Sequence, residues 1–196
     1  MNKSLEEVKS DFEKQIIVPA QTLSRQVFFC PVGLVGAGKT TITKPIAEKL
    51  GLVRISSDEL RKLLKDGGHS YDQLKTIGLD VVRGFADKGC SIAFDMDCGN
   101  PEIKKLIDTL AEKYNAKVFW VHLNTPEEHI FNKFRKHPPS WLADNPQTMI
   151  DNYMLQKIKR EEEATIFDFF FTFDTSKQDV EEQIQNCIKL ITNEIQ

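Results

Sequence analysis

Short apolar runs alternate with longer stretches of mixed polarity along most of this 196-residue chain. In the longer stretches, apolar residues recur at spacings of three and four, which is the period of a helix with one buried face. The short runs are rich in β-forming residues and occupy positions 27–30, 52–55, 90–94, 117–123 and 167–173. Because parallel strands need crossover connections, this alternation predicts an α/β fold in which helices cover both faces of a parallel sheet of about five strands.

Residues that favour helix ends mark several boundaries between these segments. Ser56 with Glu59 fits a capping box, and Thr125 with Glu128 repeats that pattern. Pro101 has the position of a first helical residue. The sequence therefore predicts helices that begin near residues 57, 101 and 126, besides amphipathic helices within 42–50, 71–88, 149–163 and 180–191.

The first 26 residues precede the alternating pattern and form a segment of their own. Leu5, Val8 and Phe12 recur there at helical spacing, which predicts an amphipathic helix. We therefore expect a helical extension over residues 1–26, in contact with the main body or with a partner, and one main domain over residues 27–196.

One glycine-rich loop indicates a specific chemistry. It reads Gly33-Leu34-Val35-Gly36-Ala37-Gly38-Lys39-Thr40 and matches the pattern G-x-x-x-x-G-K-[ST] between a predicted strand and a predicted helix. Glycines let backbone N–H groups close around phosphate oxygens, Lys39 supplies a mobile charge, and the Thr40 hydroxyl is a candidate Mg²⁺ ligand. An ordinary glycine-rich turn is the alternative, but the strand-loop-helix setting favours a nucleotide phosphate site that also includes Thr41.

Composition and charge exclude several other classes of protein. With 40% hydrophobic and 28% charged residues, the chain is neither disordered nor collagen-like. Its 26 basic and 29 acidic side chains give a net charge of -3, so nothing attracts it generally to nucleic acid or anionic lipid. No apolar run approaches the roughly 18 residues that cross a bilayer, and the four separated cysteines predict neither a disulfide nor a zinc site. We expect a cytoplasmic protein with no membrane partner.

Proteins with such a loop fall into several functional classes. A GTPase switch protein would need D-x-x-G and N-K-x-D motifs, and the nearest stretch, at 132–135, has Arg135 where the base-reading aspartate belongs. A motor or ring-forming AAA+ ATPase usually has a longer chain and an acidic pair at the end of a hydrophobic strand, whereas Met96 follows Asp95 here. Phosphotransfer to a small molecule or a polynucleotide is the class that remains.

Four segments together resemble a known group of kinases. They read GLVGAGKTT, ISSDELRKLL, IAFDMDCGNPE and HLNTPEEHIFNKFRK, and the likeness spans nearly all of the chain after Val27. The group is that of the P-loop kinases related to polynucleotide kinase, gluconate kinase, chloramphenicol phosphotransferase and zeta toxin. The resemblance implies a P-loop nucleoside-triphosphate hydrolase fold, which is three-layer α/β/α with a five-stranded parallel sheet and a helical lid over about residues 126–160. It also implies ATP and Mg²⁺ as cofactors, and a loop at 174–177 that packs near the base.

Asp58 has the position at which this kinase group carries an aspartate after the second strand. There the resemblance implies a general base that contacts the acceptor hydroxyl, and a carboxylate is able to accept that proton. The alternative is an acid in the first turn of a helix, which the helix dipole favours. Arg61 lies one turn further on, where it is a candidate to bind an anionic group of the acceptor or else a solvated helix arginine.

Asp95 ends a buried apolar run, which is the usual place for a carboxylate that holds Mg²⁺ through water near Thr40. Its alternative is an ordinary strand-to-loop aspartate. Asp97 lies two residues on and is a candidate contact of the acceptor. The group often has Asp-Thr or Asp-Asn here and an arginine after the Asn-Pro-Glu step, whereas this chain has Met96 and Ile103 at those places.

Lys133 and Arg135 match lid positions of the kinase group. The resemblance implies that they lie over the transferring phosphate, where positive charge stabilises the transition state. The alternative is that Lys133 and Arg135 only interact with the helix dipole, which favours cations near a helix C-terminus.

The sequence thus predicts an ATP-dependent kinase that moves the γ-phosphate of ATP, with Mg²⁺, to a hydroxyl of a small molecule or an oligonucleotide end. A nucleotide-binding regulatory or interaction protein with slow ATPase activity is the alternative, in which the N-terminal helix would bind a partner.

Overall fold

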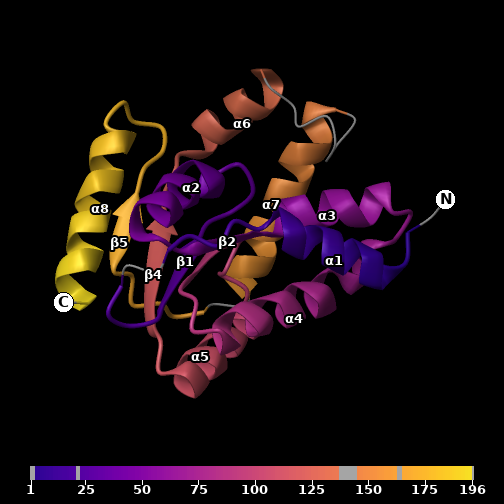
Figure 1. The fold of residues 1–196 in the computed structure, drawn as a ribbon. Coiled ribbons are helices and arrows are strands. Elements are labelled where there is room, and N and C mark those ends of the chain that lie inside the picture. The colour runs from indigo at the N-terminus through magenta and orange to yellow at the C-terminus, as the bar shows by residue number, and fades with distance from the viewer. Residues whose placement is uncertain (1–2, 21–22, 137–144, 163–164, 196) are drawn as a thin grey trace.

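The computed structural model describes residues 3–20, 23–136, 145–162 and 165–195 and has the layered architecture of Figure 1. Five parallel strands form one sheet in the order β2-β3-β1-β4-β5. The strands are β1 Val27–Val32, β2 Val53–Ser56, β3 Ile92–Asp95, β4 Lys117–Leu123 and β5 Phe171–Phe173. The predicted α/β class, with its five-stranded parallel sheet, is confirmed.

Helices cover both faces of the sheet, as Figure 1 shows. One apolar core takes side chains from α1 Leu5–Gln15, α3 Ser57–Asp66, α4 Leu74–Asp87 and α5 Pro101–Tyr114. The other takes them from α2 Lys39–Leu50, α6 Glu127–Lys136, α7 Pro146–Glu162 and α8 Val180–Ile195. The molecule therefore has three layers, α/β/α, as predicted.

The two cores follow from the alternation of side chains along each strand. In β1, Phe28 and Cys30 face the core of α3, α4 and α5, whereas Val27 and Phe29 face the core of α2 and α8. All four are fully buried. A strand that is covered on both faces is apolar at every position, which is why the central strands read as continuous apolar runs.

The N-terminal helix α1 packs on α3 and α4 of its own chain. Val8 and Phe12, which lie one turn apart, are both buried in the core that α3 and α4 also line. Ser4 and Glu7 form a complete capping box at the start of the helix, with N–H to oxygen distances of 3.2 and 2.7 Å. The amphipathic helix was predicted, and its apolar face is occupied by the main body.

The fifth strand and one helix cap differ from the prediction. β5 has three residues rather than the predicted span of 167–173. In the first part of that span the rings of Phe167 and Phe169 contact Trp120 and His122 of β4, with ring centroids 5.1 and 4.7 Å apart. α6 begins at Glu127, and Thr125 uses its hydroxyl to bind a backbone carbonyl of another loop instead of capping that helix.

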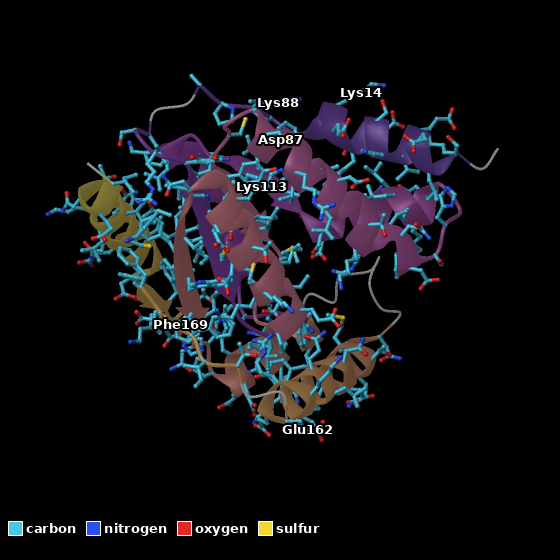
Figure 2. All side chains as sticks on the ribbon, turned by 90° about the horizontal axis from the view of Figure 1, so that it is seen from below. Lys14, Asp87, Lys88, Lys113, Glu162 and Phe169 are labelled. Atoms are coloured by element: carbon cyan, nitrogen blue, oxygen red, sulfur yellow. The ribbon has the colours of Figure 1, made fainter. Side chains whose placement is uncertain are left out.

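The two ends of the sheet differ in what lies beside them. At the amino ends of the strands, Figure 2 shows Asp87 and Lys113 side by side where α4 and α5 end, and their charged groups are 3.3 Å apart. The carboxyl ends carry the loops after β1, β2 and β3, and open parallel sheets bind ligands at these ends. Of the helices in the described ranges, none has the length and apolar character that a membrane crossing needs.

Candidate phosphotransfer site

The glycine-rich loop joins β1 to α2 and turns sharply at two glycines. Gly36 has φ of 82° and Gly38, the residue before α2, has φ of 94°, so both adopt the left-handed conformation that glycine tolerates best. Lys39 Nζ donates hydrogen bonds of 2.9 Å to the carbonyl oxygens of Gly33 and Leu34. Burial lowers the pKa of Lys39, and the nearby carboxylates of Asp97 and Asp58 oppose that shift.

Side chains from two distant loops hold the glycine-rich loop in shape. The carbonyl oxygen of Ala37 accepts hydrogen bonds from the hydroxyls of Thr125 at 3.0 Å and Thr175 at 2.9 Å. The Phe134 ring of α6 packs so closely on Gly36 that a β-carbon there would lie 2.5 Å from it. The loop that follows β5 therefore contacts the phosphate loop, and its place near the base stays a prediction.

Asp95 ends β3 next to the start of α2. Its Oδ1 accepts a 2.9 Å hydrogen bond from the hydroxyl of Thr40, and its Oδ2 forms an ion pair with Arg54, which also pairs with Glu59. Burial raises the pKa of Asp95, although the Thr40 hydroxyl and the Arg54 guanidinium favour its charged form. The predicted neighbours Thr40 and Asp95 are thus brought together.

Asp97 connects three parts of the site. Its Oδ1 accepts hydrogen bonds from the backbone N–H groups of Gly33 at 3.2 Å and Gly99 at 3.0 Å, and its Oδ2 pairs with Arg160 of α7. The guanidinium of Arg160 lies so near Gly99 that a β-carbon there would be 2.6 Å from it. Asp97 therefore joins the loop after β3 to the phosphate loop and to α7, a positioning role in addition to its place in the wall of the cavity described next.

A cavity of about 440 Å³ opens between the glycine-rich loop, α3, α4 and α5. Lys39, Thr40, Asp95 and Asp97 line the end nearest the glycine-rich loop, and Asp58 of α3 lines the same cavity. This volume lies in the range of small-molecule sites, about 300–1,000 Å³.

Asp58 and Arg61 lie one turn apart at the start of α3. Their side chains form an ion pair of 2.7 Å, and both line the cavity. The α3 helix is started by Ser56, whose hydroxyl accepts the Glu59 N–H at 3.4 Å, while the Glu59 carboxylate pairs with Arg54 instead of completing the capping box. The Asp58 side chain is 47% exposed, so it faces the solvent-filled space rather than the core.

A comparison with protein families now adds to this geometry. A family model described as an AAA domain matches residues 29–140, which is more than half of the chain. The chain belongs to the AAA domain family. No curated protein sequence matches it.

Solved structures share the fold of this AAA-domain chain over most of its length. The APS kinase CysC of Mycobacterium tuberculosis, in complex with AMPPNP and APS, is 18% identical with a TM-score of 0.56, and the match covers 85% of this chain and 98% of the kinase. A gluconokinase of Sinorhizobium meliloti is 14% identical with a TM-score of 0.56 over 88% and 97% of the two chains. A shikimate kinase of Bacteroides thetaiotaomicron is 16% identical with a TM-score of 0.52 over 85% and 97%. The predicted P-loop kinase fold is confirmed.

Two predicted lid residues of this AAA-domain chain lie away from the cavity. Lys133 lines a separate surface hollow of about 310 Å³ with His129, Asn132 and Lys136 of the same helix. Arg135 is exposed and donates a 3.2 Å hydrogen bond to Asn132. Their role in catalysis stays a prediction. Residues 137–144 of the predicted lid lie outside the described ranges.

Sequence reasoning missed four residues that shape the site. Arg54 is the one polar residue of the predicted strand at 52–55, and a charge in an apolar run is a sequence signal for a buried ion pair. Arg160 lies in a run of charged residues at the end of α7, where no pattern distinguishes it. Thr125 resembled a helix cap, and Thr175 resembled a loop residue; only the folded chain shows that both bind Ala37.

The residues beside the glycine-rich loop fit a bound Mg²⁺. Mg²⁺ prefers oxygen ligands and keeps several waters, so one hydroxyl and one carboxylate together with nucleotide phosphates suffice. The Thr40 hydroxyl and the buried Asp95 carboxylate supply such oxygens 2.9 Å apart. Within the described residues, no cluster of three or more His, Cys, Asp or Glu side chains suits another metal. Thr41 is exposed in the first turn of α2.

Proposed function

We propose that this protein is an ATP-dependent phosphotransferase, a kinase that moves the γ-phosphate of ATP to a hydroxyl group of an acceptor. The observation that carries the proposal is that Lys39 of the phosphate loop and Asp58 of α3 line one cavity. A nucleotide-binding protein without an acceptor needs the phosphate loop alone. A carboxylate beside a small-molecule cavity at the same end of the sheet is what phosphoryl transfer adds.

In this proposal the glycine-rich loop and Lys39 bind the phosphates of ATP. The backbone N–H groups of the loop and the N-terminus of α2 supply positive potential, and the Lys39 ammonium leaves its two backbone carbonyls to bind phosphate oxygen. Thr40 and Asp95 would hold Mg²⁺, which would supply positive charge beside the phosphates.

Asp58 orients the acceptor hydroxyl and accepts its proton as the oxygen attacks phosphorus. Arg61 keeps the Asp58 side chain in place through their 2.7 Å ion pair, which supports a positioning role rather than contact with an anionic acceptor. Lys133 and Arg135 of α6 are proposed to stabilise the transferring phosphate, a role that requires them to approach it from their present surface position.

In this proposal the acceptor is a small molecule or an oligonucleotide end. The protein acts in the cytoplasm, where the reducing environment keeps its four cysteines free. The regulatory alternative relied on the N-terminal helix as the element that binds a partner. Since Val8 and Phe12 are buried against the protein's own helices, that surface is already occupied, and the kinase function has the better support.

The test is transfer of the γ-phosphate from labelled ATP with Mg²⁺ into a pool of metabolites and into 5′-hydroxyl oligonucleotides, read by mass spectrometry. Lys39→Ala should abolish the product and weaken ATP binding. Asp58→Asn should keep ATP affinity and lower turnover by about 10²–10⁴-fold, the usual contribution of a general base. Asp66→Asn is the matched control, because Asp66 is an exposed aspartate at the far end of the same helix.

Circular dichroism and unfolding curves would establish that each variant folds. Turnover of Asp58→Asn equal to that of the unchanged protein would contradict the role of the base. ATP binding without a product from any acceptor would contradict the kinase function itself.

A further inference from the structure

The cavity beside the glycine-rich loop has an apolar interior that phosphate binding does not require. Besides polar residues such as Lys39, Asp95, Asn100 and Gln156, its wall has hydrocarbon from six elements of the fold. The apolar residues are Phe12, Val35, Ile55, Leu60, Leu74, Leu79, Val82, Phe94, Met96, Ile103, Leu106 and Ile107. An acceptor that filled this cavity would contact carbon on most sides.

Several of these wall residues are core residues that leave a space between them. Phe12 and Ile107 have no exposed surface and lie behind the cavity, whereas Leu74, Leu79, Met96, Ile103 and Leu106 are half-buried and carry the apolar surface that an acceptor would contact. Side chains in a protein interior normally pack to crystal-like density with few voids larger than water. A space of about 440 Å³ beside half-buried apolar side chains is large enough to hold a small molecule.

Gly78 of α4 keeps part of this space open. It lines the cavity in the middle of a helix, where glycine is the least favoured residue after proline. A β-carbon at this position would meet only Leu60 Cδ2 at 3.8 Å, which is ordinary contact. Packing of the helix therefore does not demand glycine at this position, and what the glycine preserves is volume inside the cavity.

The charges that line the cavity do not favour an anionic acceptor. Each of the three lining cations already has a partner within the described residues. Arg61 pairs with Asp58 at 2.7 Å, Lys75 pairs with Glu102 at 2.6 Å, and Lys39 binds backbone carbonyls and is assigned to ATP. Four carboxylates also line the cavity, namely Asp58, Asp95, Asp97 and Glu102. An acceptor carboxylate or phosphate would have to replace one of these partners, and it would lie close to four carboxylates, which repel it.

We propose that the acceptor is an uncharged alcohol with a predominantly apolar body, aliphatic or aromatic, which lies among α3, α4 and α5 with its hydroxyl toward Asp58. This inference rests on the proposed kinase function and names its class of substrate. The alcohol oxygen forms a bond to the γ-phosphorus, the bond from that phosphorus to the β–γ bridging oxygen breaks, and ADP leaves with the electron pair. The hydroxyl proton passes to the Asp58 carboxylate.

The first experiment measures binding, independently of transfer. Primary n-alkanols from ethanol to 1-octanol and 3-phenyl-1-propanol are titrated by calorimetry into the full chain with AMPPNP and Mg²⁺. Affinity should rise about three- to fourfold per methylene group until the cavity is filled, because each buried methylene adds a constant increment of transfer free energy. The two probe types distinguish an aliphatic from an aromatic body.

Gly78→Leu is the decisive variant, and Gly84→Leu is its matched control. Both glycines lie in α4, but Gly84 is exposed, meets nothing within 4 Å and is outside the cavity wall. Gly78→Leu should weaken 1-octanol binding by about tenfold or more, since the added side chain occupies the space. Gly84→Leu should leave it unchanged, and both variants should bind AMPPNP as the unchanged protein does.

Alkanol affinity that does not depend on chain length, or that Gly78→Leu leaves intact, would overturn the inference. Transfer from ATP is then measured on 1-octanol, gluconate, shikimate and a 5′-hydroxyl oligonucleotide. A higher kcat/KM on any of the last three would also overturn the inference while leaving the kinase function standing. Chain-length-dependent binding without transfer to any acceptor would support the apolar site and contradict the kinase function instead.

Discussion

Asp97→Ala separates a structural role of Asp97 from the acceptor contact that the sequence predicted. The change removes two hydrogen bonds to the backbone, from Gly33 at 3.2 Å and Gly99 at 3.0 Å, and the ion pair with Arg160. Hydrogen bonds to a charged group contribute about 1.5–3 kcal/mol each. Because the Asp97 side chain is 28% exposed, water replaces part of this interaction, and we expect a loss of about 2–4 kcal/mol of unfolding free energy.

Urea unfolding followed by circular dichroism measures this loss. With an m-value of about 2–3 kcal/mol/M, the midpoint should fall by about 1 M. Asp66→Ala is the control, since Asp66 pairs with Lys62 on the surface with 57% of its side chain exposed, and its change should stay within about 0.5 kcal/mol. Asp97→Asn keeps one acceptor oxygen and should lose less than Asp97→Ala.

The affinity for ATP should fall with the stability, because Asp97 fixes the backbone at Gly33 where the phosphate loop begins. An Asp97→Ala protein that unfolds at the unchanged urea concentration, binds ATP normally and shows only a raised KM for the acceptor would refute this reasoning. Asp97 would then be an acceptor contact, as the sequence indicated.

Three further predictions follow from burial. Asp95→Asn should raise the unfolding free energy at pH 7 and leave it unchanged below about pH 3.8, the ordinary pKa of an aspartate. Burial raises the pKa of Asp95 in the folded state, so the unchanged protein loses stability as pH rises above 3.8. Urea unfolding between about pH 3.5 and 8 checks this, and a variant that is less stable at pH 7 would contradict it. Phe12→Ala should lower the unfolding free energy by about 3–5 kcal/mol, or by less if the nearby cavity already deprives the ring of packing contacts. An unaltered unfolding midpoint would show that α1 is not part of the folded body. Burial raises the pKa of the Cys187 thiol to about 12, so iodoacetamide at pH 8 should alkylate Cys90, which is only partly buried, well before Cys187, as mass spectrometry of peptides would show.

The sequence is most informative where a short contiguous pattern has one physical meaning. The loop from Gly33 to Thr40 contains its glycines, its lysine and its hydroxyl in one run, so the sequence predicts both its position and its chemistry. The sequence predicts the strands β1 and β3 for a related reason, because a strand covered on both faces is apolar throughout. The pairing of Thr40 with Asp95 follows once these strands are placed side by side.

Contacts between segments that are far apart in the sequence have no local sequence pattern from which they could be predicted. Arg160 meets Asp97 across 63 residues of chain, and Thr175 meets Ala37 across 138. Each is a common polar residue in a polar neighbourhood, and its partner is set by how α7 and the loop after β5 pack. The short β5 is another case, since Phe167 and Phe169 resemble strand positions, yet Phe167 contacts Trp120 edge-on and Phe169 stacks on His122, both outside β5.

The same distinction explains why the phosphate donor is easier to infer than the acceptor. Phosphate is bound by backbone N–H groups and a lysine, which require a fixed local sequence. The proposed acceptor cavity is lined by side chains of α3, α4 and α5, each of which has the apolar periodicity of an ordinary core helix. Phe12 and Leu60 read from the sequence as packing residues, and that is also what they are. Only the space beside them, and the glycine at position 78 that lines it, distinguish the proposed acceptor site from a filled core.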